Sequence, residues 1–206
     1  MSGKARGGRA AQLELPLRRG WGGRRAGAGR KRMGPGRRNV AHRAREEHKR
    51  AHPVHVVLRS RVRSLRSQFL FSTVRRALTR ANRAREDFRI LHFSVQADHV
   101  HLIIEADTQR ALSRGMQGLA VRVARNVNPL LFRRGPFWSG RYYSRPLTSP
   151  RAFQNALSDV LNNFRKHGEP VRGDRDPCSS SIDDVRRGAP EQVPISSPKT
   201  WLARAR

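Results

Sequence analysis

The chain has 206 residues, which is room for one ordinary domain with flanking segments but not for two full domains. Its 44 Lys and Arg residues outnumber 15 Asp and Glu residues, so the formal net charge is +29. Because such self-repulsion does not favour a compact fold, the excess charge indicates a polyanionic partner, and we expect nucleic acid. A membrane is disfavoured as the partner, since no apolar run approaches the roughly 20 residues of a spanning helix.

The ends of the chain and its cysteine content suggest a compartment. The first residues lack the apolar core of a signal peptide. They are rich in Arg and poor in acidic residues, as transit peptides are, but they are also Gly-rich and show no amphipathic period, which disfavours a transit function. The single cysteine, Cys178, excludes an intramolecular disulfide and fits a reducing cytoplasm.

Residues 1–50 are expected to form a basic arm. They contain 16 Lys and Arg, three acidic residues and ten of the 17 glycines. With so few apolar side chains, the arm cannot repay its ordering entropy and is expected to be disordered alone. It is either a solubilising tail or a segment that lies along phosphates, and we favour the second. The residues expected to contact nucleic acid are Arg24, Arg25, Arg30 and Lys31.

A folded domain is expected over residues 51–168. Residues 53–59 are apolar and β-branched enough for a buried strand, and apolar residues from Leu70 to Ala81 then recur at helical spacing. Two strand-like runs follow, at 88–95 and 100–105.

The second half of the domain alternates in the same way. A helix is expected from Leu112 to Val127, ended by Asn128-Pro129, and a strand lies between Phe137 and Leu147. The basic face of this helix carries Arg114, Arg122 and Arg125. These side chains either are simply solvated or contact the phosphates of a bound nucleic acid.

The last helix has clear boundaries. Ser149 is its expected N-cap, Pro150 its first residue, and Gly168 its end. Residues 169–206 are rich in Ser, Pro, Asp and Arg and are expected to form a disordered tail. The order β-α-β-β-α-β-α predicts an α+β domain, a ferredoxin-like antiparallel sheet with helices packed on one face.

His99-Val100-His101 opens a strand-like run. Because side chains alternate along a strand, both imidazoles project from one face. Two adjacent imidazoles are half of a site for a divalent transition metal, although such a pair is more often a polar surface feature.

The segment from Asp98 to Glu105 resembles the HUH strand of single-tyrosine transposases, in particular the REP-associated tyrosine transposases and related bacterial insertion-sequence transposases. The similarity extends from about Val40 to Gly168. It includes residues 53–56 as the first strand, 94–96 before the histidines, 112–119 after them and Gly140-Arg141-Tyr142, and part of the arm (21–31) resembles the lead-in of such relatives.

The resemblance implies a mechanism. The two histidines, here His99 and His101, and a polar side chain of the last helix, here Asn163, would hold Mg²⁺ or Mn²⁺ on the phosphate of single-stranded or hairpin DNA. A tyrosine of that helix would attack the phosphorus and form a covalent 5′-phosphotyrosine. Members of the wider class work as dimers, and a bacterial cytoplasmic protein associated with the nucleoid is expected.

The chain departs from this pattern at the nucleophile. Asp159 stands where the resemblance places the tyrosine, and a carboxylate cannot serve as a stable covalent carrier of DNA; it would suit an additional metal ligand. The only tyrosines are Tyr142 and Tyr143, on the preceding strand. Their neighbours Arg141 and Arg145 suggest substrate contact, and packing at a sheet rim is the alternative for the tyrosines.

Three functions therefore remain open. The leading hypothesis is a transposase-family DNA-binding protein, active or domesticated, whose strand-transfer chemistry is in question. The second is a working nuclease that uses Tyr142, Tyr143 or a metal-activated water. The third is a non-catalytic protein that binds single-stranded DNA or RNA, although no aromatic stacking motif of the RRM type is present.

Overall fold

The computed structural model describes residues 45–166, 176–180 and 195–204, all within the compact unit Arg38–Arg206. Four strands form one sheet in the order β2-β3-β1-β4, and every neighbouring pair is antiparallel. The strands are β1 (Val54–Arg59), β2 (Phe88–Val95), β3 (His99–Ala106) and β4 (Tyr143–Pro146). The helices are α1 (Gln68–Arg83), α2 (Gln109–Leu130), α3 (Pro150–Leu161), α4 (Asn163–Lys166) and α6 (Trp201–Arg204).

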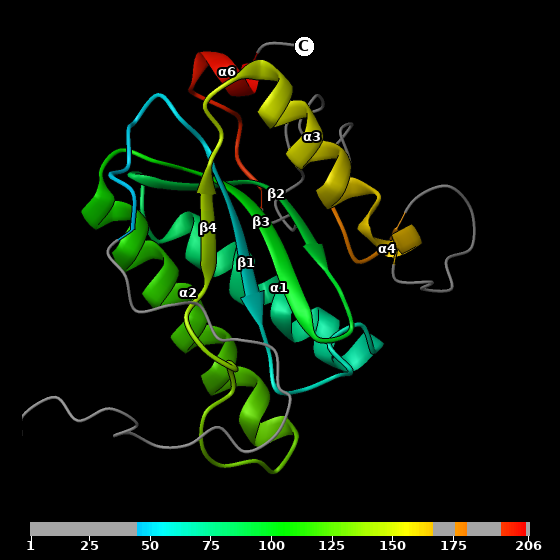
Figure 1. Ribbon diagram of the computed structural model, residues 1–206. Coiled ribbons are helices and arrows are strands. Elements are labelled where there is room, and N and C mark those ends of the chain that lie inside the picture. The colour runs from blue at the N-terminus through cyan, green and yellow to red at the C-terminus, as the bar shows by residue number, and fades with distance from the viewer. Residues whose placement is uncertain (1–44, 167–175, 181–194, 205–206) are drawn as a thin grey trace, which may run out of the picture. The chain divides into compact units, whose positions relative to one another are not determined.

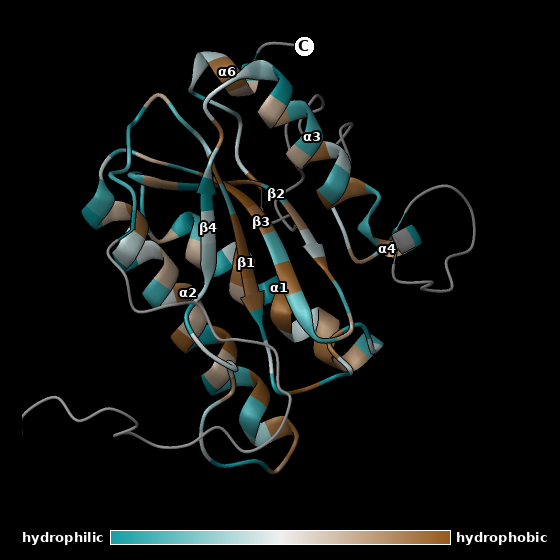
Figure 2. Ribbon diagram, viewed as in Figure 1, coloured by the Kyte–Doolittle hydropathy of each residue, from teal (hydrophilic) through white to brown (hydrophobic). Residues whose placement is uncertain are grey.

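The sheet is covered on both faces, because its central strands are apolar on both sides. Along β3, Leu102 and Ile104 pack into a core cluster with α1 and α2, whereas Ile103 between them belongs to a second cluster with α3. Figure 1 shows α1 and α2 behind the sheet and α3 in front of it. Figure 2 shows β1 largely brown and the edge strand β4 pale to teal, as expected for a central and an edge strand.

The α+β class, the antiparallel sheet and the element order up to α3 are confirmed, and the strand order is that of a ferredoxin-like domain. The expectation that all helices share one face holds for α1 and α2 but not for α3. The apolar stripe of α3 is buried by its own cluster on the opposite face, where Ile103 and Leu91 supply the sheet side of the contact.

Two helix boundaries also differ from expectation. Pro129 lies inside the last turn of α2 rather than ending it. The last helix breaks at Asn162, which caps α3 before α4 begins, and Gly168 lies outside the described residues. The start of α3 is as expected: the Ser149 side chain accepts a hydrogen bond from the backbone N–H of Ala152 at 3.1 Å.

Two segments after residue 168 pack against the domain, so the expectation of a disordered tail does not hold for them. Residues 176–180 pair with the edge of β2, where Ser180 N–H donates to the Phe93 carbonyl and Val95 N–H donates to the Cys178 carbonyl, both at 2.9 Å. The buried Asp176 carboxylate accepts two hydrogen bonds from Arg66, at 2.8 and 2.9 Å. This pairing protects an exposed strand edge.

The second segment, residues 195–204, is held by Glu105. This buried carboxylate accepts hydrogen bonds from the backbone N–H groups of Lys199 and Thr200 and from the Thr200 hydroxyl, and it is paired with Arg89 at 3.2 Å. The segment therefore packs at the end of β3 opposite to His99. Sequence composition did not indicate this contact, because residues 169–206 are rich in Ser, Pro, Asp and Arg, which is typical of a disordered tail.

Among the described residues, none of the helices combines the length and the apolar character needed to cross a lipid bilayer.

The close approach of α2 to the sheet depends on Gly115. A Cβ atom at this position would lie 2.1 Å from the Phe88 ring, which is itself fully buried, whereas a Cβ at Gly118 would meet nothing within 4 Å.

We expect Gly115→Ala to lower the free energy of unfolding by about 1–3 kcal/mol through overpacking. Gly118→Ala is the matched control on the same helix and should raise it by about 0.4–1 kcal/mol, because alanine restricts the unfolded chain. Urea unfolding of both variants measures the difference; equal effects would contradict the close packing.

Candidate functional site

Three histidines meet on the face of the sheet that α3 also covers. In the antiparallel pairing of β1 with β3, His101 lies opposite Val57 and His99 lies opposite Arg59. Side chains opposite each other in such a pair point to the same face, and so do those at every second position. His55, two residues before Val57, therefore shares its face with His99 and His101.

The imidazole rings are in direct contact. The centroids of His55 and His101 are 5.3 Å apart with the rings stacked, and those of His99 and His101 are 4.9 Å apart with the rings edge to face. A hydrogen bond of 3.1 Å joins Nε2 of His55 to Nδ1 of His101. The pair expected from the sequence is thus confirmed as a pair on one face, and a third imidazole supports it.

Each histidine of the pair has a partner at Nδ1. Nδ1 of His99 is 2.6 Å from Oδ1 of Asp98, whose Oδ2 accepts a hydrogen bond of 2.6 Å from Arg59. The hydrogen bonds from His99 and Arg59 lower the pKa of Asp98, although its partial burial opposes them. An ionised Asp98 fixes the His99 ring with Nδ1 protonated, and a ligand bond from His99 would then be made through Nε2.

His55 is held in its neutral form. Burial is the largest cause that lowers its pKa, from 6.5 to about 4, and the positive charge of Arg145 lowers it further, while Asp159 raises it. Arg145 lies opposite His55 on β4, and its side chain projects from the same face. The charge of Asp159 reaches His55, so this carboxylate of α3 lies on the histidine side of the sheet.

Asn163 follows Asp159 by four residues, across the break at Asn162. Its side chain is 5% exposed and its Nδ2 atom is buried without a hydrogen-bond partner among the described residues. A buried amide atom without a partner is unfavourable unless another group satisfies it. Within the described part of the chain no group of three or more His, Cys, Asp or Glu side chains is arranged to hold a metal ion.

The two tyrosines lie on opposite faces of the sheet. Tyr142 packs against the core beneath α1 and α2, and the Arg45 guanidinium lies 3.7 Å from its ring centroid. Tyr143 lies opposite Val57 on the histidine face and is 49% exposed. The structure therefore separates Tyr142 from the histidines. Tyr143 lies on the same face as His101, but β1 runs between their strands, so their backbones are two strand spacings apart, about 10 Å.

The expected basic residues divide between the layers. Arg145 lies beside the histidines, whereas the arginines of the α2 stripe lie in the helical layer on the other side of the sheet. Their side chains are exposed or half-buried: Arg114, Arg122 and Arg125. Arg141 precedes β4 and is half-buried. The four basic residues of the arm that were expected to bind nucleic acid lie outside the described residues.

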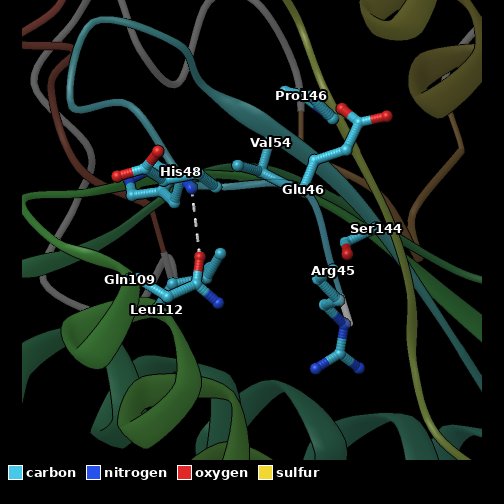
Figure 3. A pocket seen from close by; sticks show the side chains of 9 residues that line it. Arg45, Glu46, His48, Val54, Gln109, Leu112, Ser144 and Pro146 are labelled. Carbon is cyan, nitrogen blue, oxygen red and sulfur yellow. Dashed lines mark hydrogen bonds between the residues drawn. The ribbon is translucent and has the colours of Figure 1, made fainter. Parts of the chain in front are cut away.

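A pocket is present at the other end of the sheet. It is lined by Val54 and Pro146, at the ends of β1 and β4 that lie away from His99, and by side chains of residues 45–48. In Figure 3, His48 donates its backbone N–H to the Gln109 side chain. The His48 ring also contacts the Ala106 carbonyl at 2.6 Å, although residues 1–50 were expected to be disordered. Val54 and Pro146 alternate with His55 and Arg145 along β1 and β4, so these two lining residues point to the opposite face of the sheet, and the pocket is not part of the histidine face.

His55 and the role of Asp98 were not predicted from the sequence. His55 is the one polar residue in the otherwise apolar run from Val54 to Leu58, and strand pairing was needed to place it beside His101. The signal for Asp98 was its position directly before the first histidine.

Comparisons with known proteins agree with this architecture. Residues 48–153 match the family model described as "Transposase IS200 like". A solved REP-associated tyrosine transposase bound to a REP hairpin shares 17% identity with a TM-score of 0.58, over 79% of this chain and 96% of that one. A proposed transposase from Deinococcus radiodurans R1 shares 15% identity with a TM-score of 0.40, over 68% of this chain and 100% of that one. No similar sequence was found among curated proteins.

The pKa of His55 predicts how stability depends on pH in the metal-free protein. Because its pKa is about 4 in the folded state and about 6.5 in the unfolded state, the unfolded state takes up the proton first as pH falls. Stability should decline from about pH 6.5 to pH 4, by up to roughly 3 kcal/mol for this group. In denaturant unfolding with a chelator present, His55→Gln should reduce this decline. A variant with the same pH profile as the wild type would show that His55 is not the titrating group.

Proposed function

The chain belongs to the IS200-like transposase family, and we propose that it binds single-stranded or hairpin DNA ends at the histidine face without forming a phosphotyrosine. The observation that carries this proposal is the joint position of the HUH pair and Asp159. The two histidines lie side by side on β3, and the charge of Asp159 on α3 reaches the same face, at the position where the family resemblance leads us to expect the tyrosine.

The residues at the site fit a divalent metal ion. His99 and His101 have their Nδ1 atoms engaged by Asp98 and His55, which is the arrangement that orients metal-bound histidines in proteins. The Nδ2 atom of Asn163 has no hydrogen-bond partner among the described residues, which is consistent with a third ligand, since rotating the amide by 180° exchanges the nitrogen for the oxygen that binds metals. We propose His99, His101 and Asn163 as ligands of Mg²⁺ or Mn²⁺, with Asp159 as a further ligand or in contact through one water.

When bound, the metal would polarise a DNA phosphate and neutralise its charge. The protein side chains around it would position that phosphate. Arg145 projects from the same face as His55 and is exposed, so its guanidinium can pair with a phosphate oxygen in two hydrogen bonds. His55 stays neutral at physiological pH and adds no charge to this centre.

The chemistry of Asp159 argues against strand transfer. Attack by a carboxylate on phosphorus would give an acyl phosphate, which is a mixed anhydride that water hydrolyses readily, whereas a phosphotyrosine conserves the DNA end for rejoining. In addition, the helix that carries Asp159 holds no tyrosine anywhere along its length.

One observation favours a second candidate, a nuclease that uses Tyr143. This side chain is half-exposed on the histidine face, and a tyrosine side chain can span much of the distance of about 10 Å that separates the two strands. In-line attack requires an oxygen within about 3–3.5 Å of phosphorus, and Tyr143 comes from a strand rather than from the helix. The two candidates differ in whether the wild-type protein forms an adduct.

The metal proposal predicts a difference in thermal stability. Mn²⁺ should raise the melting temperature of the wild type, and the His99→Ala/His101→Ala double variant should lose this response while it stays folded. Asp98→Asn should weaken Mn²⁺ binding by roughly 10- to 100-fold, because His99 loses the carboxylate that orients it. His52→Ala is the control, since His52 lies outside the site. Identical Mn²⁺ titrations for the wild type and the double variant would refute the metal site.

The function itself is tested with a labelled DNA hairpin that carries single-stranded flanks. With Mn²⁺ or Mg²⁺ present, the wild type should bind this DNA and form no covalent adduct, whereas Asp159→Tyr should form at least a trace. Single-stranded RNA of the same sequence serves as a competitor and tests the nucleic-acid preference. A wild-type adduct mapped to Tyr143 by mass spectrometry and lost in Tyr143→Phe would establish the second candidate instead.

A further inference from the structure

We propose that Phe132 is a base-stacking side chain that holds an unpaired base of the bound DNA strand. This inference rests on the proposed DNA-binding function and assigns a contact that neither the HUH motif nor the basic stripe of α2 indicates.

Phe132 occupies an unusual position for a large side chain. It follows the C-cap of α2, its φ angle is 49°, and it is the one non-glycine residue with positive φ among the described residues. Its N–H donates to the Pro129 carbonyl at 3.0 Å, and the N–H of Arg133 donates to the Asn128 carbonyl at 2.9 Å. These two bonds define a Schellman motif, in which the left-handed residue is usually glycine.

A phenylalanine at this position gains nothing for the fold. Its side chain is 99% exposed, so it contributes no burial, and the left-handed conformation is unfavourable for a residue with a Cβ atom. A strained, fully exposed aromatic side chain suggests a role in binding rather than in stability.

The turn is held rigidly, so Phe132 is presented to solvent in one place. The side chain of Asn128 donates to the Gly135 carbonyl at 3.1 Å and closes the turn. Directly after it, Phe137 is fully buried in the core, and the indole N–H of Trp138 donates to the Ala120 carbonyl at 2.9 Å. A preorganised side chain loses little entropy when it binds.

The charge around Phe132 favours a nucleic acid over a protein partner. Arg133 and Arg134 follow it directly, and the chain from Thr108 to Ser158 contains nine arginines and no acidic residue. Arg134 is exposed, so its guanidinium is accessible to a phosphate. An aromatic ring beside basic side chains is the combination that binds single strands, where bases stack and phosphates pair.

The turn also lies at the histidine end of the sheet. The chain that follows it bridges to the end of β1, where Ser60 pairs with Trp138 and Ser139 N–H donates to the Arg59 carbonyl at 2.8 Å. Arg59 in turn lies opposite His99. In Figure 1 the yellow-green chain after α2 extends below the arrowhead of β1 before it returns to β4. One DNA strand held at the histidines can therefore continue toward Phe132.

The test measures the affinity of three variants for the hairpin with single-stranded flanks and for a fully paired duplex. Phe132→Gly should bind the flanked hairpin roughly 5- to 150-fold more weakly, which is the effect of losing one stacked base. Phe132→Trp should bind the flanked hairpin as tightly as the wild type does, because an indole ring can also stack on a base. Phe69→Ala is the matched control: Phe69 is also exposed, at 62%, but it lies on α1, and this variant should bind as the wild type does.

Two further measurements separate stacking from misfolding and from charge. Phe132→Gly should melt at the same temperature as the wild type or higher, because glycine suits the turn, and its affinity for the duplex should be unchanged. 2-Aminopurine at one unpaired position should be quenched by the wild type and not by Phe132→Gly. If the wild type binds the hairpin and Phe132→Gly binds it equally well, or loses duplex binding to the same extent, base stacking by Phe132 is refuted while DNA binding stands. If the wild type does not bind the hairpin, both proposals fail.

Discussion

The pairing register of β1 with β3 is the constraint on which the site depends. This register places His101 opposite Val57 on one face of the sheet and Leu102 opposite Val56 on the other face. Because side chains alternate between the two faces, the same register forms both the polar site and the apolar core. A slip of one residue would turn the histidines toward α1 and α2, and it would turn Leu102 and Ile104 out of the main core toward the face that α3 covers. The strong burial of these leucine and isoleucine side chains therefore also fixes the position of the histidines.

The histidine face combines groups that would be unfavourable if each stood alone. His55 is buried and uncharged, and Asp98 is ionised between Arg59 and His99. The buried Nδ2 atom of Asn163 has no hydrogen-bond partner in the part of the chain that the structure describes. Burial makes such polar networks costly when they are only partly satisfied. In this protein the unsatisfied atom comes from the same helix region as Asp159, which is where a metal ion and a phosphate would complete the network.

Much of the fold could be predicted from the sequence, because its signals are local. Helical spacing of apolar residues located both long helices, and runs of apolar and β-branched residues indicated the strands. Ser149-Pro150 marked the start of α3 correctly. The HUH pair was identified for the same reason, since alternation along one strand is enough to bring two histidines together. The placement of α3 on the other face was not predicted, because an apolar stripe indicates that a helix is buried but not which face it covers.

The features that were missed depend on contacts between distant parts of the chain. His55 joins His101 across 46 residues, and the anchoring of residues 195–204 depends on Glu105, some 95 residues away. Neither the sequence around His55 nor that of residues 195–204 contains a local pattern from which its contact partner could be predicted. To predict that Tyr142 and Tyr143 point to opposite faces, one would need to know the residue at which β4 begins. The sequence indicated only that a strand lies somewhere between Phe137 and Leu147.

The proposed DNA contacts converge on one end of the sheet because of the relative lengths of β3 and α2. β3 has eight residues and α2 has 22, which correspond to about 26 Å of strand and about 33 Å of helix. The helix begins just beyond the last residue of β3 and runs back along the sheet, so its excess length must extend past His99, where β3 starts. The chain then has to return from this overhang to β4, and the turn that begins the return carries Phe132 and two arginines. The return strand β4 then places Arg145 opposite His55, further along the same face of the sheet. A sheet edge, a helix end and a turn thus contribute to one surface although they belong to different layers of the fold.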